Sequence, residues 1–219
     1  MKRDELARLI DFTLVRPNAT ETDIRNFCKE AVENNFYAVT VNPTWVKLSS
    51  QLLKNTNTKV DVCIGFPLGA TTPQTKITET AEAINNGADE IDFVINIGAL
   101  KSGYTAFVER EIIAIVKTAG NIPVKVILET SYLSDEEKIL VCKMSLNAGA
   151  SFVKTCTGFG LTGATPEDVK LMRKTVGNLI GVKAAGGIRT YAETVSLIHA
   201  GANRIGTSTG VDILKEAPI

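Results

Sequence analysis

A repeated unit constrains this chain more than any other feature: a helical stretch, a Gly-Ala break, and then a short run rich in β-branched residues. It occurs in "AINNGADEIDFVIN", "SLNAGASFVKT" and "LIHAGANRIGT". Glycine commonly follows the C-terminus of a helix, so each copy indicates a helix that ends and leads directly into a strand. Such units predict a parallel sheet that is covered by helices.

Eight short apolar runs can be read as strands along the chain. They are "DFTLV" near residue 11, "YAVTVN" near 37, "KVDVCIGF" near 59, "EIDFVIN" near 90, "PVKVILE" near 123, "SFVKT" near 151, "LIGVKAA" near 179 and "NRIGTS" near 203. Helix starts lie between them, marked by capping-box spacing or by Pro at the first helical position. These starts are Ser134 with Glu137, Thr190 with Glu193, Thr72-Pro73 and Thr165-Pro166.

Eight strands that alternate with helices predict an α/β protein with a closed (β/α)8 fold, the TIM barrel. An open doubly wound sheet is the alternative, but the G-x-G-x-x-G motif typical of its first turn is missing. No linker, low-complexity tract or charge run marks a domain boundary. We therefore predict a single barrel domain over residues 1–219.

Composition excludes several classes of function. Lys and Arg together number 24, as do Asp and Glu, so no net charge attracts nucleic acid or an anionic membrane. The start "MKRDELARLI" lacks the apolar core of a signal peptide, and no apolar run approaches the roughly 18 residues of a membrane span. Cys28, Cys63, Cys142 and Cys156 are scattered, which favours reduced thiols. We expect a cytoplasmic protein with neither nucleic-acid nor membrane partners.

Two lysines lie at the ends of predicted strands. Lys154 follows Phe152 and Val153 in "SFVKT", and Lys183 follows Val182 in "LIGVKAA". Active sites of barrels lie at the C-terminal ends of the strands, and neighbouring strands are about 4.8 Å apart. If both side chains point inward, the two ammonium groups lie close together. The alternative is that each lysine extends past the strand end into solvent.

Schiff-base formation is the chemistry that requires two nearby lysines. The nucleophilic amine must be neutral near pH 7, whereas the ordinary pKa of a lysine is about 10.4. At roughly 6 Å and an effective dielectric constant of about 20, a second ammonium contributes about 2.8 kcal/mol, equivalent to about 2 pH units. Burial disfavours the charged amine further.

A carboxylate is needed to move protons in such a site. Asp92 lies within the predicted fourth strand, whereas Asp89 and Glu90 lie at its start, where we expect solvated charges. The alternative for Asp92 is a carboxylate that is salt-bridged inside the barrel. For Lys125 and Glu129 in and after the fifth strand, the sequence leaves open both catalytic support and filling of the barrel.

A phosphate site is predicted at the loops after the last two strands, the usual place in barrels. These loops read "AAGGIR" and "GTSTG" and contain Gly186, Gly187, Ser208 and Thr209. Two tight turns are the alternative. The one histidine, His199, is predicted on the helix before the last strand, away from the catalytic ends, and no His, Asp and Glu cluster suggests a metal.

With these residues in view, the chain resembles the deoxyribose-phosphate aldolase family of class I aldolases over nearly its whole length. The motifs that carry the resemblance are "DFTLVRPNAT", "VNPTWV", "DEIDFVINIGAL", "VKVILET", "FVKTCTGF", "VKAAGGIR" and "RIGTSTG", in this order. The resemblance implies a (β/α)8 barrel, in agreement with the strand count.

The resemblance also implies roles for individual residues. Lys154 would form the Schiff base, Lys183 would keep it neutral, and Asp92 would transfer protons. The residues that would bind the substrate and its phosphate are Thr155, Gly158, Gly186, Gly187, Ser208 and Thr209. Lys125, Asp11 and Thr13 would support the site.

The implied reaction is the reversible cleavage of 2-deoxy-D-ribose 5-phosphate to D-glyceraldehyde 3-phosphate and acetaldehyde, a lyase reaction of carbohydrate degradation. It requires no metal or organic cofactor, and we expect a homodimer or a higher homo-oligomer. Another lysine aldolase of transaldolase or fructose-bisphosphate type, or a sugar-phosphate-binding barrel without catalysis, are the alternatives. The intact lysines and Asp92 argue against the last.

Three features depart from the family motifs. Phe12 and Arg16 stand where many relatives have His and Lys, and Thr40 stands where many have Cys. The end "VDILKEAPI" lacks the tyrosine that assists proton transfer in some members. We expect these departures to affect the rate and the substrate tolerance but not the type of reaction.

Overall fold

The strands form a closed barrel. The computed structural model describes residues 1–218, and in it eight parallel strands pair in chain order, with β8 pairing with β1 to close the ring. Their bounds are β1 Ile10–Leu14, β2 Ala38–Val41, β3 Lys59–Ile64, β4 Glu90–Val94, β5 Val124–Ile127, β6 Phe152–Lys154, β7 Gly181–Ala185 and β8 Arg204–Thr207. All eight lie where the sequence predicted strands. The predicted (β/α)8 barrel is confirmed, and an open sheet is excluded.

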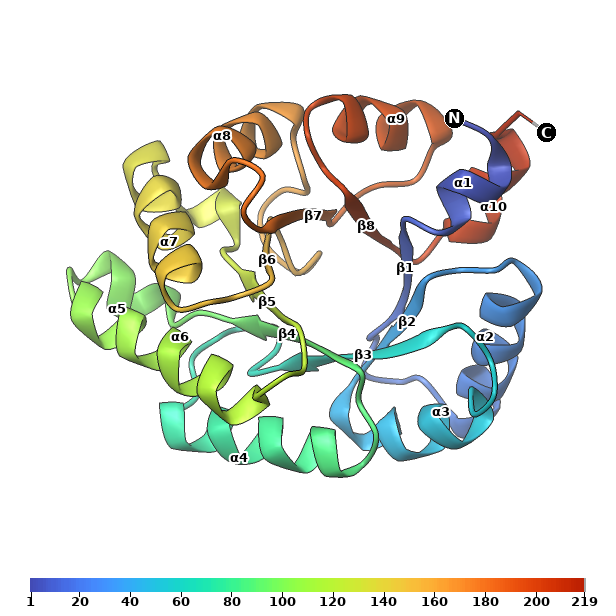
Figure 1. The fold of residues 1–219 in the computed structure, drawn as a ribbon, viewed down its shortest axis with the longest axis horizontal. Helices are drawn as coiled ribbons and strands as arrows, with labels where there is room; N and C mark the ends of the chain where they lie inside the picture. Colours follow the sequence, from blue (N-terminus) through green and yellow to red (C-terminus); the bar gives the residue numbers. More distant parts are fainter. Residues whose placement is uncertain (219) are drawn as a thin grey trace.

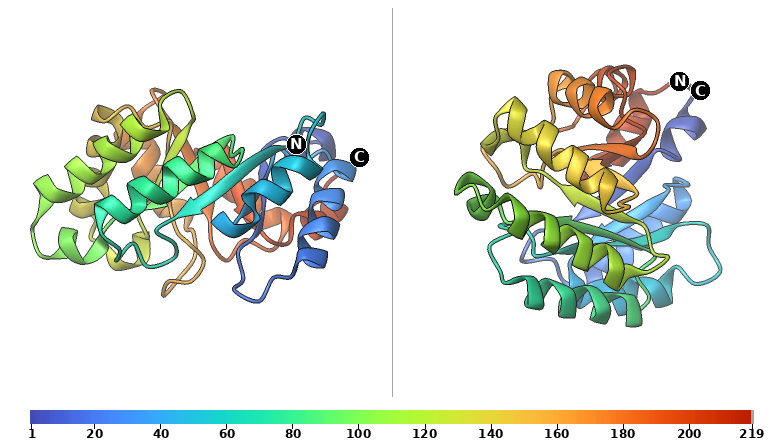
Figure 2. Two further views of the ribbon diagram at one scale, coloured as in Figure 1. Left: turned by 90° about the horizontal axis from the view of Figure 1, so that it is seen from below. Right: turned by 60° about the vertical axis from the view of Figure 1, so that its left-hand side comes forward.

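Helices surround this ring on the outside (Figure 1). The α-helices are α1 Arg3–Ala7, α2 Glu21–Glu33, α3 Val46–Leu52, α4 Pro73–Asn85, α5 Ile97–Lys101, α6 Thr105–Ala119, α7 Asp135–Asn147, α8 Pro166–Val176, α9 Tyr191–His199 and α10 Gly210–Glu216. Two short 3-10 helices, η1 Pro43–Trp45 and η2 Thr130–Tyr132, follow β2 and β5. The first and last helices lie side by side (Figure 2), and the Arg3 amide donates to the Pro218 carbonyl at 3.0 Å.

The predicted helix boundaries have clear local causes. Ser134 and Thr190 accept from the backbone amides of Glu137 and Glu193, whose side chains bond back to the cap residues. Gly87 follows α4 with φ of 98°, a conformation that side chains with a Cβ rarely adopt. Its amide donates to Ile84 and the next amide to Ala83, the bond pattern of a Schellman motif. The Gly-Ala breaks are therefore helix ends.

Each strand has an apolar outer face and contributes polar side chains to the barrel interior. Ile91 and Phe93 on β4 are fully buried in the hydrophobic core between strands and helices. Asp92 between them points the other way and contacts Lys125 and Lys183 from other strands. The barrel interior is therefore charged, in contrast to the branched aliphatic filling that is usual for this fold.

A second buried ion pair lies outside the barrel. The Lys76 ammonium on α4 is 2.8 Å from Glu111 Oε1 on α6 and donates to the Val94 carbonyl at 2.7 Å. The other oxygen of Glu111 accepts from the Asn96 amide at 3.0 Å. This pair fixes two helices to the C-terminal end of β4.

Within residues 1–218, no helix combines the length and the apolar character that crossing a lipid bilayer requires. The four cysteines are free and buried.

Candidate active site

A cluster of eight charged side chains fills the barrel interior. Four are carboxylates and four are cations, and none is more than 7% exposed. The carboxylates are Asp11, Asp61, Glu90 and Asp92, and the cations are Lys125, Lys154, Lys183 and Arg204. Seven of the eight strands contribute to this set, which we call the interior charge cluster. Its formal charges balance, as burial in a low-dielectric interior requires.

Lys154 and Lys183 lie side by side, as the sequence predicted. They are paired across β6 and β7 at the same height. Both ammonium groups contact one atom, Asp92 Oδ2, at 2.6 Å for Lys154 and 2.7 Å for Lys183. Since both contact the same oxygen, the two nitrogen atoms are separated by no more than about 5.3 Å. Neither side chain extends into solvent.

Charges around Asp92 and Lys183 fix the ionisation of both. Burial alone would raise the pKa of Asp92, but Lys125, Lys154 and Lys183 outweigh it and hold that pKa well below its usual range. Burial alone would lower the pKa of Lys183, but the carboxylates around it, led by Asp11, raise that pKa above its ordinary value. Asp92 is therefore an anion and Lys183 a cation at neutral pH.

Lys125 and Asp11 belong to the cluster and not to the cavity wall. The Lys125 ammonium is 2.7 Å from Glu90, and 2.9 Å from both Asp61 and Asp92. Lys125 is thus buried inside the barrel and contacts Asp92, so both of the roles that the sequence left open stay predictions. Asp11 pairs with Lys183 at 2.6 Å, and the Thr13 hydroxyl donates to the Asp11 carbonyl at 3.0 Å.

The expectation of a solvated Glu90 was wrong. Glu90 is 4% exposed and pairs with Lys125 and, at 3.2 Å, with Arg204. The Tyr37 hydroxyl donates to the other carboxylate oxygen of Glu90 at 3.1 Å, and these partners bury the Glu90 side chain at the start of β4. Asp89 is partly exposed and pairs with Lys59 at 3.5 Å, as expected for a strand start.

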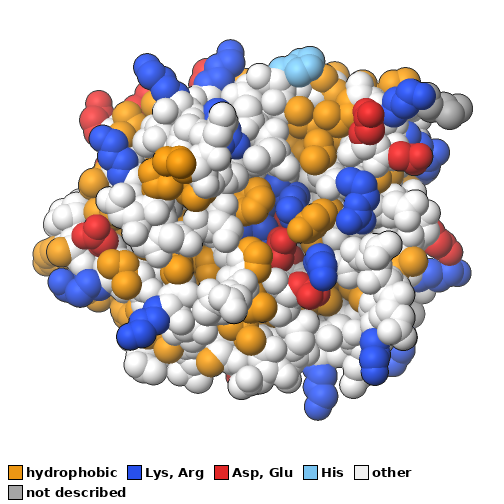
Figure 3. All heavy atoms as spheres, viewed as in Figure 1, with side chains coloured by type: hydrophobic (Ala, Val, Ile, Leu, Met, Phe, Trp, Pro, Cys, Tyr) orange, Lys and Arg blue, Asp and Glu red, His pale blue; other side chains and the backbone are white. Residues whose placement is uncertain are grey.

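A cavity of about 310 Å³ opens above the cluster at the C-terminal ends of the strands. Its walls come mainly from β1 and from the loops after β3, β6, β7 and β8. The lining residues are Thr13, Leu14, Val15, Arg16, Cys63, Phe66, Lys154, Thr157, Gly158, Phe159, Ala185, Gly186, Gly187, Ile188, Arg189, Gly206, Thr207 and Ser208. On the face drawn in Figure 3, basic and acidic side chains gather at a hollow near the middle of the molecule.

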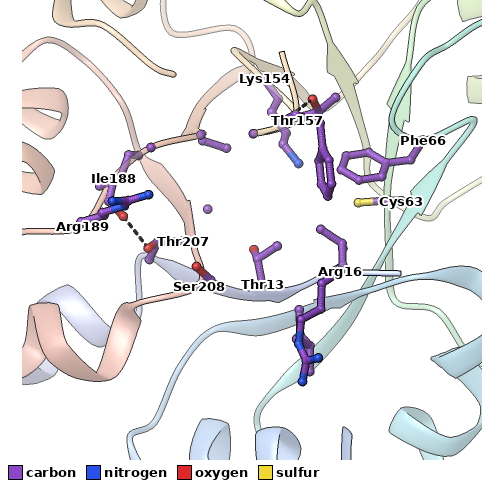
Figure 4. A pocket seen from close by; sticks show the side chains of 18 residues that line it. Thr13, Arg16, Cys63, Phe66, Lys154, Thr157, Ile188, Arg189, Thr207 and Ser208 are labelled. Carbon is purple, nitrogen blue, oxygen red and sulfur yellow. Dashed lines mark hydrogen bonds between the residues drawn. The ribbon is translucent and has the colours of Figure 1, made fainter. Parts of the chain in front are cut away.

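Lys154 is the one cation of the interior charge cluster that also lines this cavity. Figure 4 shows its ammonium reaching into the space, with Cys63 and Phe66 on one side and Arg189 and Ser208 on the other. Asp92 and Lys183 lie beneath it in the barrel. A molecule in the cavity therefore meets the amine of Lys154 first.

The loops predicted to bind phosphate reach the cavity, with two exceptions. Gly158, Gly186, Gly187 and Ser208 line it. Thr155 and Thr209 do not line it. The Thr155 hydroxyl donates to the Ala185 carbonyl at 2.9 Å and accepts from its amide at 3.0 Å, and the Thr209 hydroxyl bonds to Thr207 and Ile188. Both threonines therefore stabilise the loops without lining the cavity.

Two arginines lie at the rim, and neither was predicted from the sequence as a binding residue. Arg16 and Arg189 line the cavity on side chains that are largely exposed. Arg16 pairs with Asp23 at 2.8 Å, and within residues 1–218 Arg189 lies near the carboxylate of Glu193 without forming an ion pair. The signal for Arg189 was its place two residues after the Gly-Gly pair in "AAGGIR".

Of the other departures from the family motifs, Phe12 is explained by packing and Thr40 by the interior charge cluster. The Phe12 ring stacks on Phe27 with centroids 4.2 Å apart, outside the barrel and away from the cavity. The Thr40 hydroxyl donates to Asp61 Oδ2 at 2.8 Å. Asp61 itself was not singled out from the sequence, although it lies within an apolar strand just as Asp92 does.

Glu129 holds the loop that follows Lys154. Its backbone is left-handed, with φ of 56°, and its side chain is 2% exposed. One carboxylate oxygen accepts from the Thr157 amide at 3.0 Å and also from the Thr157 hydroxyl. A strained backbone that aims a buried carboxylate at a loop of the cavity is typical of a residue that positions a site.

An apolar wall lies opposite the arginine rim. Phe66 and Phe159 meet edge to face with centroids 5.5 Å apart. Burial raises the pKa of the neighbouring Cys63 thiol to about 12, so this thiol stays protonated. His199 ends α9 at the opposite end of the barrel, as predicted. Residues 1–218 bring no three His, Cys, Asp or Glu side chains together in an arrangement that could hold a metal ion.

Comparisons with known proteins agree with this geometry. The model of the DeoC/LacD family aldolases matches residues 6–216. A deoxyribose-phosphate aldolase of Caldanaerobacter subterraneus is 54% identical over 99% of this chain and 96% of its own length. One from Streptococcus gordonii is 56% identical over 96% of both chains.

Solved structures give the same result. A putative deoxyribose-phosphate aldolase from Coccidioides immitis superposes with a TM-score of 0.95 at 39% identity, over 99% of this chain and 87% of its own. The deoxyribose phosphate aldolase from Aeropyrum pernix, described as a tetramer, has a TM-score of 0.91 at 37% identity, over 97% and 91%. The barrel, the paired lysines below the cavity and these matches lead to one conclusion: the chain belongs to the DeoC/LacD family of aldolases.

Proposed function

We propose that this chain is a class I aldolase that cleaves 2-deoxy-D-ribose 5-phosphate reversibly to D-glyceraldehyde 3-phosphate and acetaldehyde. The observation that carries the proposal is the position of Lys154: its amine reaches the cavity while its other side contacts Asp92 and lies next to Lys183. The names of relatives that are more than half identical over nearly the whole chain support the substrate.

The first steps use Lys154 as nucleophile. Its neutral amine attacks C1 of the open-chain sugar, and loss of water gives an imine that carries a positive charge. The cation of Lys183 beside it favours the neutral amine before the attack. Lys183 itself stays charged because its carboxylate partners hold it so.

The next steps break the carbon chain. Acetaldehyde contains C1 and C2, so the bond that breaks is C2–C3, and the proton of the C3 hydroxyl must leave. Asp92 is the anion at this position and removes that proton, directly or through a water molecule. The electrons of the bond pass to the imine and form an enamine. Glyceraldehyde 3-phosphate leaves, and protonation and hydrolysis of the enamine release acetaldehyde.

The phosphate of the substrate binds at the side of the cavity that the loops after β7 and β8 form. The loops with Gly186, Gly187 and Ser208 allow close backbone approach, and Arg189 adds a cation at the rim. The apolar wall of Phe66 and Phe159 lies on the opposite side of the cavity. This arrangement orients one end of the sugar by charge and leaves C1 near Lys154.

Covalent trapping tests the proposal. Borohydride added with 2-deoxyribose 5-phosphate should attach a carbon fragment to the peptide that contains Lys154, because it reduces an imine irreversibly. Acetaldehyde release should be lost in Lys154→Met and kept in Lys170→Met, which removes an exposed lysine on α8. A label on Lys183, or full activity of Lys154→Met, would contradict the assigned roles.

We propose further that residues 1–219 act as one barrel domain, that the enzyme works in the cytoplasm, and that it assembles as a homo-oligomer. Four free thiols fit a reducing compartment. The tetramer described for the Aeropyrum pernix aldolase supports self-association. Light scattering on the purified chain tests the assembly, and a mass of one chain would contradict it.

A further inference from the structure

The interior charge cluster raises a question about protons that the aldolase mechanism leaves unanswered. Its four carboxylates and four cations balance only while Lys154 carries its proton. Schiff-base formation requires a neutral Lys154, which leaves three cations against four carboxylates. A net charge inside the barrel is unfavourable, because a buried charge without a counterion has lost its contact with water. A proton retained within the cluster removes this cost.

Distances favour Asp61 as the group that takes this proton. Asp92 lies within 2.6 to 2.9 Å of three ammonium groups, and Asp11 has cations at 2.6 and 2.8 Å. Glu90 lies 2.7 Å from Lys125. Asp61 has no cation closer than 2.9 Å among the residues that the structure describes. The closest cation of Asp61 is therefore farther away than the closest cation of any other carboxylate in the cluster.

The partners of Asp61 differ in kind as well. The Thr40 hydroxyl lies 2.8 Å from Asp61 Oδ2 and can turn from donor to acceptor when that oxygen gains a proton. The side chains that form ion pairs or hydrogen bonds with Asp92 and Asp11 within residues 1–218 are cations, which donate only. Glu90 has the Tyr37 hydroxyl but contacts neither Lys154 nor Lys183.

We propose that Asp61 is a positioning residue that holds the balancing proton while Lys154 is neutral, an inference that rests on the proposed aldolase function. A continuous path joins the two groups: Lys154 Nζ to Asp92 Oδ2 at 2.6 Å, Asp92 Oδ2 to Lys183 Nζ at 2.7 Å, and Lys183 Nζ to Asp61 Oδ2 at 2.9 Å.

The transfer balances along this path. An N–H bond of Lys154 breaks and its proton passes to Asp92. Asp92 passes a proton to Lys183 while Lys183 hands one to Asp61, where an O–H bond forms. Lys183 and Asp92 end as they began. The total charge of the cluster is unchanged, and no electron pair leaves it.

The surroundings of Asp61 support this direction. Burial raises its pKa, and the charge of Asp92 adds to the effect, whereas the pKa values of Asp11 and Asp92 are lowered. The charged and titratable groups that act on Asp61 come from five strands. They are Asp11 on β1, Cys63 on β3, Asp92 on β4, Lys125 on β5 and Lys183 on β7. The other members of the interior charge cluster are Glu90 on β4, Lys154 on β6 and Arg204 on β8.

Infrared difference spectroscopy of the complete chain at pH 7 tests the proposal without substrate. Lys154→Met fixes the cation count at three and should show the carbonyl stretch of one protonated carboxylic acid. The double variant Lys154→Met with Asp61→Asn should lack this band, and wild type should show it in the fraction of molecules in which Lys154 is neutral. Lys154→Met with Asp89→Asn, which removes a partly exposed carboxylate one strand away, should keep it. A Lys154→Met spectrum without this band, or a band that persists when Asp61→Asn is added, overturns the proposal.

Two further measurements remain decisive if Asp61→Asn folds poorly or if the substrate is wrong. Thr40→Val removes the acceptor for the acid proton and should shift the band to higher frequency, and an unshifted band assigns it to another group. In a folded Asp61→Asn protein, kcat/KM should fall less than tenfold, against more than a hundredfold in Asp92→Asn, and equal losses contradict the proposal. A wild type that shows the band but cleaves no sugar phosphate contradicts the proposed function alone.

Discussion

Replacing Lys183 separates its field effect from a direct chemical role. Lys183→Met removes one positive charge within about 5 Å of the Lys154 nitrogen. At that distance and an effective dielectric constant of about 20, the interaction lost is about 3 kcal/mol, equivalent to about 2 pH units. Because a neighbouring cation opposes protonation of Lys154, its removal favours the protonated and inactive amine. The acidic limb of the pH profile should therefore move upward by about 2 units.

The assay is kcat/KM for 2-deoxyribose 5-phosphate cleavage between pH 6 and 10. Activity of Lys183→Met should fall about a hundredfold at pH 7 and recover most of its loss by pH 9 to 10, since the nucleophile is still present. Lys154→Met should show no recovery. Lys76→Met removes an equally buried ammonium outside the barrel and should leave the acidic limb of the pH profile unchanged.

Stability must be followed in the same samples, since Lys183→Met also leaves three carboxylates without this partner. Breaking a buried ion pair typically costs about 3 to 5 kcal/mol. Circular dichroism and urea unfolding identify the variants that are folded at the assay temperature. If a folded Lys183→Met protein is equally inactive from pH 7 to pH 10, the field effect is refuted and Lys183 acts as a proton donor or a substrate ligand.

Three other outcomes are expected. Unphosphorylated 2-deoxyribose should be a much poorer substrate than its 5-phosphate, and Arg189→Gln should narrow that gap in kcat/KM; equal use of both sugars by wild type would show that the loops are only turns. Glu129→Ala removes the carboxylate oxygen that accepts both bonds from Thr157 and should lower kcat/KM about tenfold or more, mainly through KM, with Glu79→Ala as a control because it also removes a carboxylate that accepts from a backbone amide. The lowered pKa of Asp92 stabilises the fold above the pKa of the unfolded chain, about 3.9, and this contribution is lost as the pH falls through the folded value. Asp92→Asn should therefore flatten the fall in unfolding free energy below about pH 4, and an unchanged slope would contradict this.

The barrel could be predicted from the sequence because its signals are local. Glycine at positions 87, 149 and 201 ends a helix through its own backbone freedom, and Ser134 and Thr190 begin helices through bonds three residues away. Such features depend on a few neighbouring residues. Their regular alternation with apolar runs then allows few folds other than a closed barrel.

The candidate site could be predicted only in part, because its polar contacts join distant strands. Lys154, Lys183 and Asp92 interrupt apolar runs and were found by that signal. Glu90 was misjudged because its burial depends on Tyr37, which directly precedes β2, and on Arg204 on β8. Asp61 gave the same signal as Asp92 but gained meaning only once its bonds to lysines of β5 and β7 were known.

The closure of the ring has a consequence for how the chain assembles. Asp11 on β1 finds its cations on β7 and β8, and its bond to Arg204 spans 193 positions of the sequence. Until the last two strands are in place, a growing or partly unfolded chain lacks the two closest counterions of this carboxylate. Pairing this distant is slow to form and leaves exposed strand edges in the meantime. We therefore expect the pairing of β1 with β8, together with the ion pair between Asp11 and Arg204, to be required for closing the barrel. A chain truncated before β8 should collapse without reaching the native fold.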